Sequence, residues 1–303
     1  MRLLVTDLDN TLYDWVTFFA TSFRAMLGKL VTILATDEDE LIRQFKALHQ
    51  LHGTSERPFT AVELPAAQAM FQGLDRLAIA RELEPAFQTF EQSRDATLRS
   101  YQGVDTTLSY LHSAGVAIVG HTEAPYPNAC QRLRLLGIDR YFDSLYATAS
   151  DNWRPDRGRP HSRIPDEERL VHILPVGQRK PNPEILLDIC DREGVQPAET
   201  VYVGDSLTRD ISMANAAGVI SVWASYGTSF DPQLWAFLVR ISHWTDREVA
   251  REAELRRRDD LAPNFEITSF GEIVGVAGLQ TPAHPQVGTV HELANDPATG
   301  GGR

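Results

Sequence analysis

The sequence has only two cysteines, Cys130 and Cys190, in 303 residues. Two thiols cannot build the disulfide framework of a small secreted domain, and they fit a reducing compartment as small apolar core residues. Basic residues are also in the minority, with 29 Lys and Arg against 41 Asp and Glu and a net charge of −12. We therefore expect neither a nucleic-acid polymer nor an anionic membrane as a partner, because both require clustered positive charge.

Long uncharged hydrophobic runs are lacking as well. No stretch approaches the roughly 18 uncharged apolar residues that a bilayer span needs. The apolar start is interrupted by Asp7 and Asp9, which argues against a signal peptide. We expect a soluble cytoplasmic protein without a membrane anchor. The hydrophobic content of 43% is sufficient for a core, and the length suggests one large domain or two modest ones.

What the sequence does have is a pair of acids at the end of its first apolar run. Residues 3–6 predict a short buried strand, and Asp7 and Asp9 follow it directly. Their spacing points both side chains the same way. Two like charges repel unless a cation joins them, so the pair indicates a site where one acid attacks or binds a metal and the other moves protons. A solvated turn is the alternative interpretation.

The rest of the chain divides into a helical part and an alternating part. Apolar residues recur at helical spacing between residues 14 and 100 and predict four or five helices, one starting at Thr36. From residue 101 helices alternate with strands, expected at residues 116–120, 141–147, 200–203, 220–224 and 265–267. This alternation predicts an α/β fold, a Rossmann-like parallel sheet with helices on both faces. Ligands bind beyond the carboxyl ends of such strands.

Other polar residues follow later strands or open a helix. Thr122 and Glu123 follow the second predicted strand, and Asp205 and Asp210 follow a third in a Gly-Asp-x4-Asp pattern. Lys180 precedes a Pro-Asn-Pro helix start. Because the carboxyl ends of parallel strands meet at one edge, we expect Asp7, Thr122 and Asp205 to converge.

The ordered set Asp-x-Asp-x-Thr, Thr, Lys and Gly-Asp-x4-Asp resembles the haloacid dehalogenase-like hydrolase superfamily over roughly residues 1–230. Its start and the helical segment are similar to a branch with a helical cap after the first motif, which includes phosphoglycolate phosphatases and pyrimidine 5′-nucleotidases. The resemblance implies an α/β core at residues 1–13 and 101–278 and a cap at 14–100. Composition further predicts a disordered tail at 279–303.

The same resemblance implies a Mg²⁺-dependent phosphomonoesterase acting on a small phosphorylated metabolite. Asp7 would be the nucleophile and Asp9 the acid and then the base. Asp7, the backbone carbonyl of Asp9, and Asp205 would bind the metal. Asp210 would hold Lys180 or a metal-bound water, or else cap its helix. The implied substrate-binding and catalytic side chains comprise Leu8, Thr11, Thr122, Glu123 and Lys180, with Thr122 and Lys180 contacting the phosphoryl group.

Several alternatives stay open at this point. Glu123 stands where members of the superfamily commonly carry Asn, and His121 is either a hydrogen-bonded structural residue or a catalyst. A phosphomutase would use the same acids, and a non-catalytic protein could bind a phosphoryl ligand there. Asp9 argues against a dehalogenase. Four aromatic residues, Tyr13, Trp15, Phe18 and Phe19, are interpreted as helix packing or as a platform for a base. The Arg-rich loop at 150–169 is either a substrate-facing flap or a solvated insertion.

Overall fold

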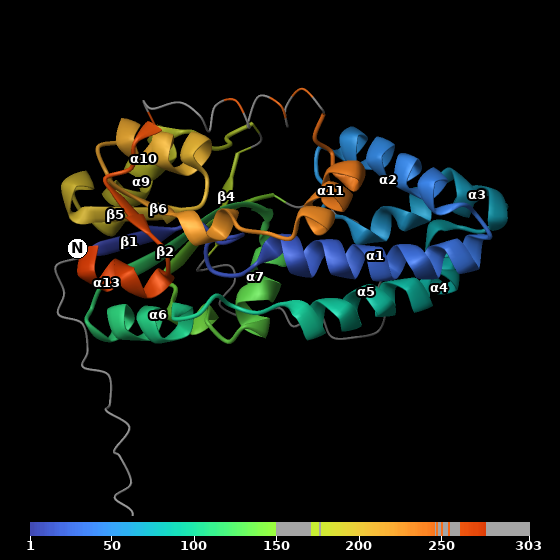
Figure 1. Ribbon diagram of the computed structural model, residues 1–303, viewed down its shortest axis with the longest axis horizontal. Coiled ribbons are helices and arrows are strands. Elements are labelled where there is room, and N and C mark those ends of the chain that lie inside the picture. Colours follow the sequence, from blue (N-terminus) through green and yellow to red (C-terminus); the bar gives the residue numbers. More distant parts are fainter. Residues whose placement is uncertain are drawn as a thin grey trace, which may run out of the picture.

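The computed structural model describes residues 1–149, 171–175, 177–245 and 261–276, and the single positions 247, 250 and 254. These residues contain one parallel sheet of seven strands in the order β4-β3-β2-β1-β5-β6-β7 (Figure 1). The strands are β1 (Leu3–Thr6), β2 (Ala117–Pro125), β3 (Ser144–Thr148), β4 (Val171–Leu174), β5 (Thr200–Gly204), β6 (Ile220–Ala224) and β7 (Phe265–Ile267). The predicted α/β Rossmann-like fold is confirmed.

Three strands differ from the sequence-based prediction. Strand β2 continues to Pro125, so Thr122 lies within the strand instead of after it. Strand β3 begins only at Ser144, because Asp139–Tyr141 forms a 3-10 turn (η2) ahead of it. Strand β4 was not predicted, because it has only four residues and lies at the edge of the sheet, where most of its side chains are partly buried or exposed.

Alternating side chains of the buried strands build a hydrophobic core on each face of the sheet. Leu3 and Val5 of β1 point to the face covered by α9 (Pro183–Glu193) and α10 (Ser212–Ala216). Leu4 points to the opposite face, where α6 (Val104–Ser113), α7 (Tyr126–Leu135) and the short α13 (Ile273–Val276) pack. Helices therefore cover both faces, as parallel strands without a solvent-facing side require.

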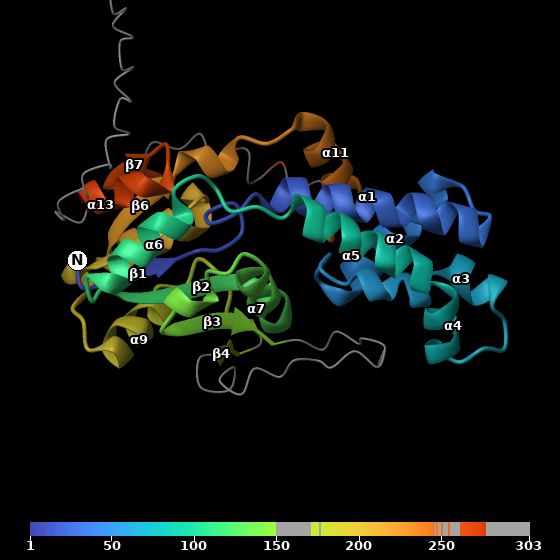
Figure 2. The same ribbon diagram turned by 90° about the horizontal axis from the view of Figure 1, so that it is seen from below.

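Residues 14–100, called the helical insert below, contain no strand and run from α1 to α5. Their elements are α1 (Trp15–Leu34), α2 (Glu38–His52), the 3-10 helix η1 (Pro58–Glu63), α3 (Pro65–Met70), α4 (Arg76–Glu82) and α5 (Glu84–Thr97). Both views show α1 and α5 side by side, extending away from the sheet (Figures 1 and 2). The start of α2 differs from the prediction, because Asp37 and not Thr36 accepts the first backbone hydrogen bonds.

The two ends of the helical insert lie next to each other. An isolated bridge pairs Tyr13 with Ser100, and the amide of Tyr101 donates to the carbonyl of Leu12. The connections at residues 13 and 101 are thus adjacent, at the carboxyl end of β1. The division of the chain into a core domain and a cap domain at these residues stays a prediction.

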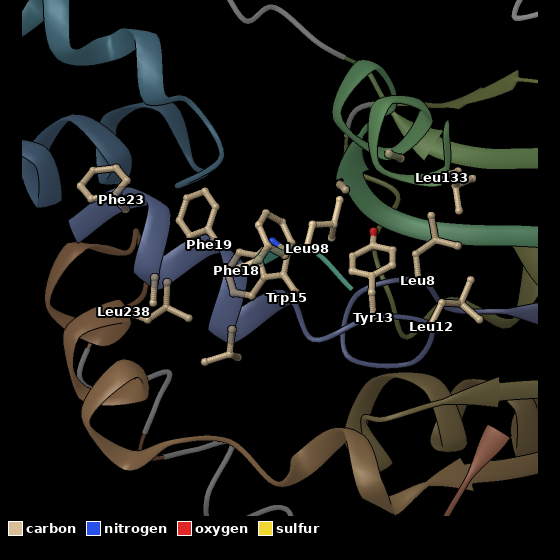
Figure 3. Packing of buried hydrophobic residues seen from close by; sticks show 14 of the residues in the cluster. Leu8, Leu12, Tyr13, Trp15, Phe18, Phe19, Phe23, Leu98, Leu133 and Leu238 are labelled. Carbon is tan, nitrogen blue, oxygen red and sulfur yellow. The ribbon is translucent and has the colours of Figure 1, made fainter. Parts of the chain in front are cut away.

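A helix from beyond the sheet also packs on the helical insert. Helix α11 (Pro232–Ile241) lies against α1 and α2. The Nδ1 atom of His49 lies 2.5 Å from the carbonyl oxygen of Ile241, and Arg240 pairs with Asp39. Phe23, at the centre of α1 (Figure 3), packs its ring against Phe45 of α2 with 4.7 Å between centroids. The hydrophobic core therefore continues from the sheet into the helical insert.

Helix α1 is the one described helix whose length and composition would let it cross a membrane. It has 20 residues and a mean hydropathy of 1.3, and half of its apolar window is buried inside the protein. Arg24 and Lys29 interrupt its apolar run, which is why the sequence showed no uncharged span. Its apolar side chains are accounted for by packing against α2, α5 and α11.

Parts of three sequence-based predictions lie outside the described residues. They are the Arg-rich loop at 150–169 with Arg154, Arg157 and Arg159, most of the charged helix expected at 246–258, and the tail at 279–303. They stay predictions.

Removing the Phe23 side chain should test the packing of the helical insert. Phe23 is fully buried and contacts rings from α2 and α11. We expect Phe23→Ala to lower the free energy of unfolding by about 3–5 kcal/mol, because a large buried ring leaves a cavity. Urea unfolding should show the exposed Leu51→Ala control within about 0.5 kcal/mol of wild type. Equal effects of the two substitutions would contradict this packing.

Candidate active site

The order of the strands places the Asp-x-Asp-x-Thr motif and the Gly-Asp-x4-Asp motif next to each other. The chain fills one half of the sheet from β1 to β4, then returns to place β5 beside β1. Such a reversal leaves a crevice at the carboxyl ends of the two central strands. Asp7 follows β1, and its amide donates to the carbonyl of Val203 in β5. Asp205 follows β5 directly, so the two carboxylates come from neighbouring strand ends.

Lys180 joins two of the buried acids. Its Nζ lies 2.5 Å from Oδ1 of Asp7 and 2.9 Å from Oδ1 of Asp210. All three side chains are at most one-tenth exposed. Asp210 also accepts hydrogen bonds from the Tyr202 hydroxyl and the Ser206 amide. Of the alternatives for Asp210, the structure therefore favours holding Lys180, and the start of its own helix is capped by Ser206.

The glycine before Asp205 permits this arrangement. A Cβ built on Gly204 would lie 2.6 Å from the Cβ of Asp210, closer than real side chains approach. Only a residue without a side chain lets Asp210 fold back onto the end of β5 and reach Lys180. The glycine of the Gly-Asp-x4-Asp motif thus has a packing reason of its own.

Three carboxylates could hold a metal ion. Asp7, Asp205 and Asp210 each offer an oxygen, and these oxygens lie within 4.8 Å of one another. Asp205 is buried, and its carboxylate has no hydrogen-bond or ion-pair partner among the residues that the structure describes. A buried carboxylate without a partner is costly, and a divalent cation would remove that cost. Hard oxygen ligands of this kind suit Mg²⁺.

Burial also shifts the protonation of these acids. It raises the pKa of Asp7 to about 7, an effect that Lys180 opposes and that Asp210 and Asp9 reinforce. Burial likewise raises the pKa of Asp205 well above its ordinary value, with Asp210 and Asp7 adding to it. Burial lowers the pKa of Lys180, but Asp210 and Asp7 more than compensate, so the ammonium stays charged. The site therefore carries excess negative charge that a cation would balance.

Asp9 has a different partner from the other acids. Its Oδ1 lies 2.9 Å from Nη1 of Arg132 in α7, and its side chain is 24% exposed. Burial raises the pKa of Asp9 to about 6, which Arg132 opposes and Glu56 reinforces. Neither Arg132 nor Glu56 was singled out from the sequence, because Arg132 lies in an ordinary helix and Glu56 in a loop of the helical insert.

The loop between β1 and α1 fixes the first motif. Thr11 donates from Oγ1 to Oδ2 of Asp7 over 3.3 Å, and the Tyr226 hydroxyl donates to the Thr11 carbonyl. Asn10 takes the left-handed conformation with φ 58°, and its side chain accepts from the amides of Trp15 and Val16 at the start of α1. The predicted contact residue Leu8 is fully buried in the hydrophobic core, which leaves only its backbone for a ligand.

Thr122 and Glu123 of β2 contribute a hydroxyl group and an ion pair. Thr122 is buried, and its Oγ1 accepts from the Ala124 amide, so its own proton can be donated to a ligand. The Glu123 carboxylate pairs with Nη1 of Arg209 over 3.0 Å. Burial lowers the pKa of Arg209, but Glu123, Asp210 and Asp205 outweigh this effect, and the net shift of the pKa is upward. The guanidinium therefore keeps its positive charge. Arg209 had not been singled out from the sequence.

Two open alternatives receive a structural answer. His121 is fully buried with Nδ1 3.5 Å from the Tyr202 hydroxyl, and burial lowers its pKa well below the ordinary value, with Lys180 adding to the effect. A neutral buried ring favours the structural interpretation. The aromatic residues at the start of α1 are also buried, and Trp15 stacks on Phe19 with 5.0 Å between centroids (Figure 3). This favours packing over a platform for a base.

A comparison with known families now identifies the class. A family model described as haloacid dehalogenase-like hydrolase matches residues 1–218. The chain belongs to this family of hydrolases, as the order of its motifs predicted.

Relatives within the family are phosphatases by name. The chain is 26% identical to a glyceraldehyde 3-phosphate phosphatase of Methanopyrus kandleri, over 91% of this chain and 97% of the relative. It is 32% identical to a phosphoglycolate phosphatase of Salmonella paratyphi A, over 76% of this chain and 83% of the relative. These matches confirm the predicted enzyme class, a phosphatase.

A solved structure supports the fold. The 2-haloacid dehalogenase from Pseudomonas syringae pv. tomato DC3000 matches with a TM-score of 0.53 and 20% identity, over 92% of this chain and 99% of that chain. At this identity the likeness concerns the fold alone.

The raised pKa of Asp7 predicts how stability depends on pH in the metal-free protein. The pKa of this carboxyl is about 7 in the folded protein and 3.8 in the unfolded chain. The free energy of unfolding therefore falls as the pH rises between these two values, because the unfolded chain releases the proton more easily. The asparagine of the Asp7→Asn variant does not ionise, so this variant does not lose stability in this way. We expect its free energy of unfolding to rise relative to that of wild type as the pH increases from 4 to 7. Urea unfolding with EDTA across that range measures the difference. A constant difference, like that expected for the exposed Asp95→Asn control, would contradict the burial of an ionisable Asp7.

Proposed function

We propose that the chain is a Mg²⁺-dependent phosphomonoesterase that acts on a small phosphorylated metabolite through an aspartyl-phosphate on Asp7. The observation that carries this proposal is the buried contact of Lys180 with Asp7 and Asp210 beside the unpartnered carboxylate of Asp205. A nucleophile, a fixed positive charge and a set of oxygen ligands for a cation are what phosphoryl transfer to a carboxylate requires.

Each residue has a task that follows from its surroundings. Asp7 attacks phosphorus with the carboxylate oxygen that does not face Lys180, while Lys180 and the Thr122 hydroxyl bind phosphoryl oxygens. Asp9 gives a proton to the departing ester oxygen and later takes one from the water that attacks the phosphorylated Asp7. Mg²⁺, held by Asp7, the Asp9 carbonyl and Asp205, would neutralise phosphate charge and orient the phosphoryl group.

We favour small substrates over nucleotides for two reasons. The curated relatives are named for phosphoglycolate and glyceraldehyde 3-phosphate, both short phosphorylated compounds. The aromatic residues that would have stacked on a base are buried in the helical insert. We also propose the cytoplasm as the location of the enzyme, which its two buried cysteines, not joined in a disulfide, support.

Phosphate release from a panel of phosphomonoesters tests the proposal. The panel contains 2-phosphoglycolate, glyceraldehyde 3-phosphate, a pyrimidine nucleoside monophosphate and 4-nitrophenyl phosphate. With Mg²⁺ we expect turnover of the short esters, a loss of about 1,000-fold or more in kcat for Asp7→Asn, and loss of activity with EDTA.

The control and the contrary results are equally defined. Asp95→Asn replaces an exposed acid on α5 and should retain wild-type activity. Turnover that survives in Asp7→Asn would exclude Asp7 as the nucleophile. Turnover that survives EDTA would exclude the metal.

A further inference from the structure

A chain of three charges, Asp9 and the buried Arg132 and Glu56, leads from the candidate active site into the helical insert. Arg132 donates from Nη1 to Asp9 over 2.9 Å, and its Nη2 lies 2.7 Å from Oε1 of Glu56. The side chains of Arg132 and Glu56 are 6% and 8% exposed. The two guanidinium nitrogens thus serve two different carboxylates, one in the candidate active site and one in the loop between α2 and η1.

Glu56 is fixed from several sides. Trp15 of α1 donates from Nε1 to its Oε1 over 2.8 Å, and Asn128 of α7 donates to its Oε2 over 2.9 Å. The guanidinium of Arg132 also lies over the ring of Phe18, with 5.2 Å from Cζ to the centroid. These contacts fix the plane of the guanidinium as well as its position, and Figure 3 shows Trp15 and Phe18 together at the start of α1.

Arg132 stabilises both carboxylates, which repel each other. A buried ion is strongly destabilising when its partner is missing, because its lost hydration is not replaced. If the loop with Glu56 moved away, Arg132 would keep one carboxylate and lose the other. The position of the helical insert is therefore coupled to the hydrogen bond that Asp9 receives.

We propose that Arg132, held by Glu56, is the positioning residue of Asp9 in the first phosphoryl transfer, an inference that rests on the proposed function. In that step a bond forms between an Asp7 oxygen and phosphorus, the bond from phosphorus to the ester oxygen breaks, and the Asp9 proton moves to that oxygen. Arg132 occupies Oδ1 of Asp9, which leaves Oδ2 to carry the proton. A planar guanidinium that is held by Glu56 through Nη2 presents Nη1 to Asp9 in a fixed direction, whereas the single ammonium of a lysine would not.

The dependence on the leaving group distinguishes positioning from a structural role. An alkyl ester such as 2-phosphoglycolate needs a proton on its departing oxygen, but 4-nitrophenyl phosphate releases 4-nitrophenolate, which is stable as an anion. We therefore compare kcat/KM for 2-phosphoglycolate with kcat/KM for 4-nitrophenyl phosphate, written as the ratio of the first to the second. Each value of kcat/KM reports only the steps up to the first phosphoryl transfer. A misplaced Asp9 should therefore lower the ratio, while general damage to the fold should lower both values together.

We expect Arg132→Lys to reduce the ratio of kcat/KM by roughly ten-fold or more, with a smaller decrease for Glu56→Gln, which retains the shape of the side chain. Glu56→Gln carries the same comparison if Arg132→Lys does not fold. Arg192→Met, which removes an exposed ion pair on α9, is the matched control and should leave the ratio unchanged.

An unchanged ratio in folded Arg132→Lys and Glu56→Gln, with an active wild type, would overturn the role of Arg132 and leave the proposed function intact. A wild type without turnover of either ester would instead overturn the proposed function on which this role rests.

Discussion

The site depends on the ammonium group of Lys180, which lies between Asp7 and Asp210 in a part of the molecule nearly closed to water. Without it, Asp7, Asp205 and Asp210 would be three uncompensated charges within a few ångströms. One lysine balances only part of this charge. Burial, together with the remaining negative charge, keeps the pKa of Asp7 at about 7. A divalent cation would balance that charge, so the same imbalance that costs stability would supply electrostatics for phosphoryl transfer.

The sheet makes this contact possible. Pairing of β1 with β5 brings together chain segments almost 200 residues apart, and the reversal of strand order leaves their carboxyl ends open. The helical insert begins and ends at the same point, since Tyr13 pairs with Ser100. Helix α11 and the Asp9–Arg132–Glu56 chain give it two further attachments to the rest of the molecule. The candidate active site and the helical insert are therefore connected by side-chain contacts as well as by the polypeptide.

Residues at strand ends were accessible to prediction, and residues that act from elsewhere were not. Asp7, Lys180, Asp205 and Asp210 stand out because acids and a lysine interrupt apolar or helix-starting patterns, and parallel strands bring their ends together. Arg132 lies 123 residues from Asp9 in sequence, on a helix where any arginine is ordinary. Glu56 and Arg209 are similarly inconspicuous, because their meaning comes only from partners that folding supplies. Strand β4 was missed because its four residues are too few to show a period and its burial does not alternate.

Direct detection of phosphate on Asp7 tests the central claim. Asp9→Asn should slow the attack of water on the phosphorylated carboxylate, because the base that activates that water is gone. Wild type and Asp9→Asn can be mixed with 4-nitrophenyl phosphate and Mg²⁺, quenched in acid, and analysed by peptide mass spectrometry. The account predicts one phosphoryl group on the peptide that contains Asp7, accumulating in Asp9→Asn and absent from Asp7→Asn. Turnover without any phosphorylated Asp7, or a phosphoryl group on another residue, would contradict it.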